Sequence, residues 1–157
     1  MARAMDDAVL RSMAKWPNVP DVYGWLSLDR RGNWLLKGER IGNAALREFI
    51  GRNYAADERG RWYFQNGPQR VFVALAYTPL VVHYEGDQLV DHCGRPFVPA
   101  LALQDDEGSV LFEGGQTVAL LDDRDLARFA DQNPSPAALN RADVAARFGF
   151  VPDPKPG

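Results

Sequence analysis

The sequence predicts an α+β fold of antiparallel sheets with a duplicated β-hairpin–helix unit, and with N-terminal and C-terminal helices. Three observations predict it: short apolar runs between glycine-containing turns, amphipathic segments preceded by helix-capping residues, and the same order of these features in both halves. The chain has 157 residues, 46% hydrophobic and 25% charged, which is typical of one globular domain. We therefore expect a single domain over residues 1–157, with pseudo-repeats at about 24–54 and 100–132.

The first pseudo-repeat follows an expected helix over residues 3–15. Residues 25–28 and 34–36 predict a hairpin, because both are apolar and the turn between them ends in Gly32. Asn43 is a good N-cap residue, and it predicts a helix with an apolar face that includes Leu46 and Phe49. The first repeat is thus a hairpin followed by a helix.

The middle of the chain predicts an antiparallel meander. Its expected strands are residues 62–64, 71–76, 80–84 and 89–90, separated by turns that contain glycine or proline. Residues 91–99 hold two prolines and a glycine, so we expect an irregular crossing between the two halves.

The second pseudo-repeat has the same features in the same order. Residues 101–103 and 110–112 predict a second hairpin, and its glycines, Gly108 and Gly114, are six residues apart, as Gly32 and Gly38 are. Asp122 predicts the N-cap of a helix that carries Leu126 and Phe129, with the spacing of Leu46 and Phe49. One small insertion aligns the two copies.

Two further segments close the chain. Ser135-Pro136 predicts a helix start, with an N-cap residue followed by proline. Asn140 and Asp143 resemble a capping box before an expected C-terminal helix, which Gly149 ends. We expect the proline-rich tail, residues 152–157, to be frayed.

Several short motifs together resemble an uncharacterised bacterial family defined as a domain of unknown function. They lie within about residues 24–120 and comprise Gly32-Asn33-Trp34, Gly38, Ile41, Leu46, Phe49, Arg61-Trp62-Tyr63, Pro68-Gln69-Arg70-Val71 and Thr78-Pro79-Leu80-Val81. The resemblance implies an α+β fold with repeated motifs and a ligand-sensing or signalling role. Gln69 stands where the family usually has glutamate, so no carboxylate function is expected there.

The cysteine content and the lack of long apolar segments indicate the cellular compartment of the protein. The single cysteine, Cys93, excludes an intramolecular disulfide and fits a reducing compartment. Residues 1–15 carry charges instead of the apolar core of a secretory signal, and no apolar run reaches 18 residues. We therefore expect a cytoplasmic protein that does not enter a membrane.

One cluster of residues suggests nucleophilic chemistry. Cys93 follows Asp91 and His92, and His83 lies ten residues earlier. A thiol-dependent hydrolase would use Cys93 as nucleophile, His83 or His92 as base and Asp91 to orient the base. However, adjacent strand residues point to opposite faces, which would turn His92 away from Cys93.

Other catalytic and cofactor signatures are missing from the sequence. Two histidines and one cysteine fall short of a closed zinc site, and the acidic groups at 105–107 and 122–125 lack calcium-loop spacing. The glycine-rich phosphate-binding motifs are also missing. We expect no metal and no cofactor.

The charge distribution suggests a further alternative. Residues 1–78 hold 12 basic and 8 acidic side chains, whereas residues 79–157 hold 6 and 13. The first half could bind a polyanion or nucleic acid through its arginines and aromatic side chains, namely Arg30, Arg31, Arg40, Arg70, Trp34, Trp62 and Tyr77. Strand periodicity instead favours Trp34 and Trp62 as core residues, and we do not expect nucleic-acid binding.

The sequence favours a non-catalytic ligand- or partner-binding or regulatory module over an enzyme. We expect its ligand, an unknown small molecule or protein, to lie between the repeats near residues 91–99, because irregular segments between subdomains commonly line binding clefts. The candidate ligand-binding residues are Tyr77, His83, Arg70 and Arg95. A homodimer is a further expected form of partner.

Overall fold

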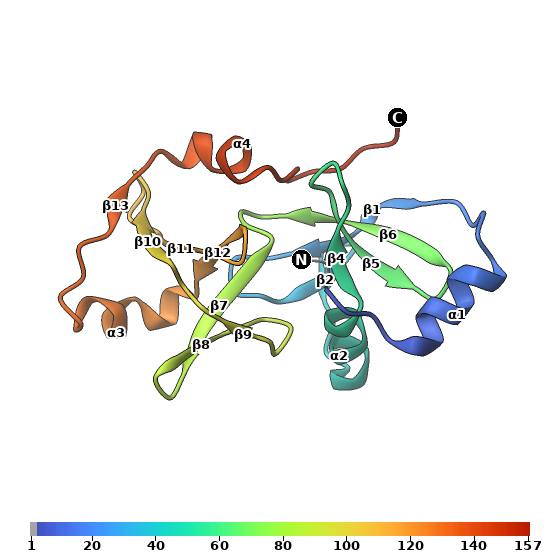
Figure 1. Ribbon diagram of the computed structural model, residues 1–157, viewed down its shortest axis with the longest axis horizontal. Helices are drawn as coiled ribbons and strands as arrows, with labels where there is room; N and C mark the ends of the chain where they lie inside the picture. The colour runs from blue at the N-terminus through green and yellow to red at the C-terminus, as the bar shows by residue number, and fades with distance from the viewer. Residues whose placement is uncertain (1–2) are drawn as a thin grey trace. The chain divides into compact units, whose positions relative to one another are not determined.

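A computed structural model describes residues 3–157 and divides the chain into two compact units (Figure 1). Unit 1 contains the described residues up to Asp29, together with Asn33–Ala76 and Phe150–Gly157. Unit 2 contains Arg30–Gly32 and Tyr77–Gly149. Each unit holds one mostly antiparallel sheet with short helices, which confirms the α+β fold class.

Unit 1 is a six-stranded sheet with two helices. The sheet order is β3-β2-β1-β6-β5-β4. Its strands are β1 (Val22–Leu28), β2 (Trp34–Leu36), β3 (Glu39–Arg40), β4 (Tyr54–Ala56), β5 (Trp62–Asn66) and β6 (Gln69–Leu75), and its helices are α1 (Asp7–Lys15) and α2 (Ala44–Arg52).

Unit 2 is a seven-stranded sheet of order β13-β10-β11-β12-β7-β8-β9. Its strands are β7 (Leu80–Glu85), β8 (Gln88–Asp91), β9 (Pro96–Phe97), β10 (Leu101–Gln104), β11 (Val110–Gly114), β12 (Thr117–Leu121) and β13 (Ala137–Ala138). Its helices are η1 (Asp123–Asp125), α3 (Leu126–Ala130), η2 (Arg141–Asp143) and α4 (Val144–Phe148).

The two sheets share one strand order. In unit 1, two antiparallel meanders meet where β1 pairs with β6 in parallel; in unit 2, two meanders meet where β7 pairs with β12 in parallel. Strands β1–β6 therefore correspond to β7–β12, with a helix between β3 and β4 but only residues 98–100 between β9 and β10. This correspondence differs from the alignment of residues 24–54 with 100–132, which stays a prediction.

Four hairpins share one turn, with aspartate first and glycine fourth. In each, the aspartate carboxylate accepts the backbone N–H four residues later at 2.8–3.1 Å, and the glycine has φ between 78° and 85°. The pairs are Asp29 with Gly32, Asp57 with Gly60, Asp91 with Gly94 and Asp105 with Gly108. Glycine is favoured there because it adopts positive φ without strain.

Side chains pack against both faces of the sheet of unit 1. Successive residues of β5 point to opposite faces, so Phe64 and Tyr63 show what packs on each face. Phe64 packs edge-to-face on Phe49 of α2. Tyr63 packs on Phe72, and Met5, just before α1, packs against this cluster. Trp34 and Trp62 are 2% and 7% exposed, as strand periodicity predicts.

Several sequence predictions need correction. Ser135-Pro136 starts no helix; β13 follows and pairs in parallel with β10. The segment 91–99 is not an irregular crossing, since the Asp91 turn joins β8 to β9. Gly114 is a strand residue, and the turn lies at Gly115 and Gln116, which have positive φ.

The ends of the chain also differ in detail. The first helix begins at Asp7, later than residue 3. The C-terminal tail is paired at its start, because the Leu75 N–H donates to the Pro152 carbonyl at 2.7 Å, and Pro154 is buried. Within residues 3–157, no helix combines the length and the apolar character needed to cross a membrane.

Candidate ligand-binding sites

A polar cleft of about 410 Å³ in unit 2 contains both histidines. It lies beside β7 and the start of η1. Its lining residues are Arg31, Gly32, Val81, Val82, His83, Tyr84, His92, Asp122, Arg124 and Asp125. We call it the polar cleft.

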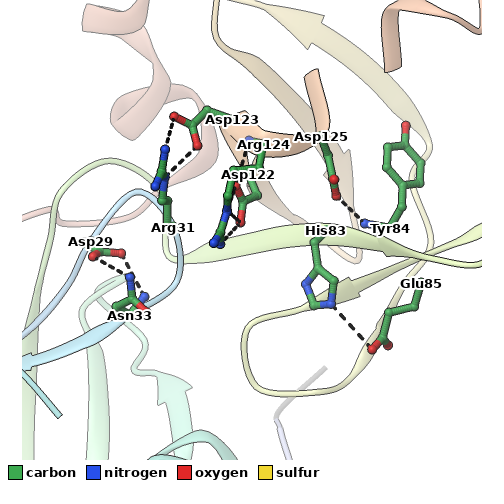
Figure 2. Close-up of polar contacts among 10 residues, drawn as sticks. All are labelled: Asp29, Arg31, Asn33, His83, Tyr84, Glu85, Asp122, Asp123, Arg124 and Asp125. Atoms are coloured by element: carbon green, nitrogen blue, oxygen red, sulfur yellow. Dashed lines mark hydrogen bonds and ion pairs between the residues drawn. The ribbon is translucent and has the colours of Figure 1, made fainter. Parts of the chain in front are cut away.

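The charged side chains that line the polar cleft form hydrogen bonds and ion pairs with other residues of unit 2. Arg31 donates to both carboxylate oxygens of Asp123, with the shorter distance 2.8 Å, and Arg124 donates to Asp122 at 2.6 Å (Figure 2). The Tyr84 N–H donates to Asp125 at 2.8 Å. The guanidinium and carboxylate groups that line this cleft therefore already have hydrogen-bond partners within unit 2.

Asp122 has the N-cap role that its sequence context predicts. Its side chain accepts the N–H of Arg124 at the start of η1. Burial alone would raise the pKa of this carboxyl, but hydrogen bonds from the Arg124 side chain and backbone outweigh it and lower the pKa below its usual value. Asp122 is therefore a charged capping group at neutral pH.

The two histidines have different surroundings. His83 is exposed at 43% of its side chain, and its Nε2 lies 3.6 Å from a carboxylate oxygen of Glu85 (Figure 2). His92 Nδ1 accepts the backbone N–H of Val81 at 3.2 Å. A Cβ on Gly32 would lie 2.7 Å from the His92 Cβ, so this contact requires glycine.

Three residues of the thiol alternative, Asp91, His92 and Cys93, lie in a structural turn, whereas His83 lies on β7. Asp91 is 2% exposed, and one of its carboxylate oxygens accepts the N–H groups of Cys93 and Arg95 at 2.9 and 3.1 Å. Cys93 is half-buried at the third position of this turn. The turn therefore gives Asp91 a structural role.

The four candidate ligand-binding residues belong to different units. Tyr77, His83 and Arg95 are in unit 2, whereas Arg70 is in unit 1. The buried Tyr77 hydroxyl donates to Asp105 at 2.7 Å. Burial, and then this hydrogen bond, raise the pKa of Tyr77 above its usual value.

Arg30, one of the arginines of the polyanion alternative, lies beside Tyr77. The guanidinium groups of Arg30 and Arg141 lie 5.1 and 4.7 Å from the centre of its ring. Arg30 also donates to Ser109 at 2.7 Å. Among residues 3–157, no group of three histidine, cysteine or acidic side chains could hold a metal ion.

An apolar groove of about 470 Å³ lies in unit 1, along α2 and the sheet. Its lining residues are Val22, Trp25, Leu26, Leu36, Ile41, Leu46, Ile50, Phe64, Asn66, Gln69 and Val71. Nine of these eleven side chains are apolar, which is typical of small-molecule pockets. We call it the apolar groove.

Three side chains of the apolar groove are unusually exposed for their type. Trp25, Leu36 and Leu46 are 49%, 47% and 41% exposed. Asn43 caps α2 by accepting the Leu46 N–H at 2.9 Å, which fixes this turn of the helix beside the sheet. Exposed apolar side chains that cluster at one concave surface mark a binding site more often than scattered ones do.

Polar groups lie at the edges of the apolar groove. The Lys37 ammonium is 3.7 Å from the centre of the Trp25 ring, a cation–π contact. The amides of Asn66 and Gln69 line the groove where β5 turns into β6. The groove thus combines apolar side chains with two hydrogen-bonding amides, and the Lys37 cation lies against the ring of one lining residue, Trp25.

Sequence reasoning missed the apolar groove. It treated residues 25–28 as one strand and placed Leu46 on the packed face of α2. The sequence does contain one signal of this groove, the adjacent apolar residues Trp25 and Leu26. In a regular strand, adjacent side chains point to opposite faces of the sheet, so these two residues can line the same surface only if the strand is locally irregular. The structure has such a register shift, between Val22 and Leu26.

The sequence of this chain matches the model of one protein family. A family model described as "Protein of unknown function (DUF2946)" and labelled DUF2944 matches residues 5–155. The chain belongs to this family. The resemblance to an uncharacterised domain-of-unknown-function family is thereby confirmed, and comparison with curated proteins finds no match.

Solved structures share the fold of this family member. A DUF1285 family protein from Silicibacter pomeroyi DSS-3 is 20% identical, with a TM-score of 0.52 over 76% of this chain and 74% of its own. A DUF1285 family protein from Shewanella baltica OS155 is 13% identical, with a TM-score of 0.52 over 69% of this chain and 92% of its own. At these identities the likeness concerns the fold alone.

Proposed function

We propose that this protein is a non-catalytic module that binds a small amphipathic molecule in the apolar groove of unit 1. The observation that carries the proposal is the gathering of Trp25, Leu36 and Leu46, each more than two-fifths exposed, at one concave surface. Burying such side chains against a ligand is favourable, by roughly 1.5–3 kcal/mol for a fully buried leucine.

The walls of the groove indicate the chemistry of the ligand. Most lining side chains are aliphatic, which favours a flexible hydrocarbon body. Lys37 supplies a positive charge beside Trp25, which favours an acidic head group. A medium-chain carboxylate has both properties, and decanoate is a suitable probe.

The polar cleft supports the proposal less well. Arg31 and Arg124 already make ion pairs with Asp123 and Asp122, so a ligand would have to displace bonds that are satisfied. The apolar groove has no comparable cost, because exposed leucine and tryptophan surfaces gain by leaving water.

The test compares two leucines of equal exposure. Leu46 lies in the groove and Leu101 lies on β10, and both are 41% exposed. We expect Leu46→Gln to raise the dissociation constant of decanoate about tenfold, which corresponds to about 1.4 kcal/mol. Leu101→Gln should leave it unchanged, with calorimetry of the full chain as the measurement.

Two outcomes would contradict the proposal. The first is the same affinity for decanoate in wild type and Leu46→Gln. The second is a concentration-dependent dimer in sedimentation velocity that Leu46→Gln dissociates, because the groove would then be an interface between two copies of the chain.

A further inference from the structure

We propose that unit 1 carries a second small-molecule site, on the face of the sheet opposite the apolar groove, which takes a neutral planar ring with an N–H donor. Phe64 and Asn66 line the apolar groove, while Gln65 between them lines a separate cavity of about 290 Å³. This cavity is lined by Met13, Trp16, Pro17, Val19, Asp21, Gln65, Pro68 and Arg70.

Gln65 supplies the observation that points to a ligand. The residue is only 2% exposed, and its Nε2 donates to the Gly67 carbonyl at 3.1 Å. This bond fixes the amide orientation, because a carbonyl needs a donor. Oε1 is then a buried acceptor with no hydrogen-bond donor among residues 3–157. Such an acceptor costs free energy unless a partner reaches it.

The neighbours of Gln65 define the rest of the site. Arg70 pairs with Gln65 across β5 and β6, so their side chains lie side by side on one face. Its guanidinium lies 3.9 Å from the centre of the Tyr63 ring, and within residues 3–157 it makes no ion pair. Arg70 therefore keeps N–H donors for a ligand carbonyl.

The walls of this cavity favour a flat ligand without net charge. Trp16 is 56% exposed and offers an aromatic face for stacking. One acidic and one basic side chain, Asp21 and Arg70, balance each other in the lining. A cyclic amide or imide fits this set, with its N–H on Gln65 Oε1 and its carbonyl on Arg70.

The experiment uses uracil and 1,3-dimethyluracil as probes of the full chain, with binding followed by calorimetry and by saturation-transfer NMR. The two rings stack alike, but only uracil has N–H donors. We expect uracil to bind at least about tenfold more tightly than 1,3-dimethyluracil. No binding of uracil, or equal binding of the two probes, would overturn the proposal; in the first case the cavity holds only water.

Variants separate recognition from folding. Gln65→Met keeps the length of the side chain and removes both the buried acceptor and the Nε2 donor to the Gly67 carbonyl, so we expect it to abolish the preference for uracil. Gln88→Met, at an exposed glutamine of β8, should retain the preference. If Gln65→Met fails to fold, the two probes on the wild-type chain still decide. Decanoate binding is measured separately, so this proposal and the proposed function can fail independently.

Discussion

The two units share a strand order but differ in what lies between their meanders. In unit 1, α2 follows β3, lies along the sheet and forms one wall of the apolar groove. In unit 2, residues 98–100 join β9 to β10, and the cleft of that unit is lined by charged side chains that pair with neighbours. One inserted helix therefore distinguishes a sheet with an apolar groove from a sheet with a cleft of paired charged side chains.

The aromatic side chains follow the same division. All four tryptophans belong to unit 1, where Trp34 and Trp62 are buried and Trp16 and Trp25 are exposed. Unit 2 holds no tryptophan, so intrinsic tryptophan fluorescence reports on unit 1 alone. The unfolding of unit 1 can therefore be followed by this signal without a contribution from unit 2.

The largest expected effect is the loss of a core tryptophan in unit 1. Trp34 packs edge-to-face on Tyr54 at a centroid distance of 4.9 Å and is 2% exposed. Trp34→Ala should lower the free energy of unfolding by about 3–5 kcal/mol, measured by urea denaturation. Trp25→Ala is the control and should cost less than about 1 kcal/mol, since half of that side chain is in water. Equal losses would show that Trp25 is a core residue.

A smaller loss of stability is expected at Gly114 of unit 2, where the backbone lies close to Phe97 and Val98. A Cβ on Gly114 would overlap the Val98 carbonyl oxygen and lie 3.1 Å from the Phe97 ring. Gly114→Ala should therefore destabilise the protein by about 1–3 kcal/mol in thermal denaturation. Gly42→Ala is the matched control, because a Cβ at Gly42 would have no neighbouring atom within 4 Å. A neutral Gly114→Ala would mean that residues 97–98 relax freely.

The next effect depends on pH and concerns a turn of unit 1. Burial favours a raised pKa for Asp57, but hydrogen bonds from the Arg61 backbone and side chain outweigh it and lower the pKa below its ordinary 3.8. A carboxyl with a lowered folded-state pKa stabilises the fold above its unfolded pKa, and this stabilisation is lost as the pH falls through the folded value. Asp57→Asn should therefore destabilise the protein at neutral pH.

The same variant tests the sign of this linkage. The difference in unfolding free energy between wild type and Asp57→Asn, measured by urea denaturation, should shrink as the pH falls below about 3.8. Asp87→Asn, at an exposed aspartate of the β7–β8 turn, is the control. A difference that grows at low pH would contradict the role assigned to Asp57.

The smallest effect on stability belongs to the groove itself. Leu46→Gln should change the free energy of unfolding by no more than about 0.5 kcal/mol, because Leu46 is 41% exposed and lines an open groove. Thermal denaturation measures this. A loss of several kcal/mol would make Leu46 a packing residue and weaken its use as a probe of the groove.

The sequence predicted most elements that have a local signal. Asn43, Asp122 and Gly149 were identified from capping chemistry, and each has that role in the structure. Strand β12 was missed although residues 118–121 are an apolar run after a glycine-containing turn, which is a local strand signal. Its parallel pairing with β7, which joins the two meanders of unit 2, is a long-range contact that no local pattern encodes. Ser135-Pro136 was misread since proline also suits the start of an edge strand.

The groove and the cavities were less predictable than the helices and strands. Arg70 was selected from its sequence context, but the cavity beside it depends on Gln65 and on Met13 of α1, which reaches it only in the folded unit. The apolar groove likewise requires α2 to lie along a sheet whose order is not local. Hydrophobic periodicity indicates which apolar side chains share one face of a helix or strand. It does not show which of them remain exposed to solvent in the folded unit.

A methyl NMR titration of the full chain with decanoate tests directly whether a ligand binds in the apolar groove. We expect the methyl signals of Leu36, Leu46, Ile41 and Ile50 to shift together with one dissociation constant, while those of Leu101 do not move. Shifts at Leu101 equal to those at Leu46, or no shift at any groove methyl, would contradict a ligand site in the apolar groove of unit 1.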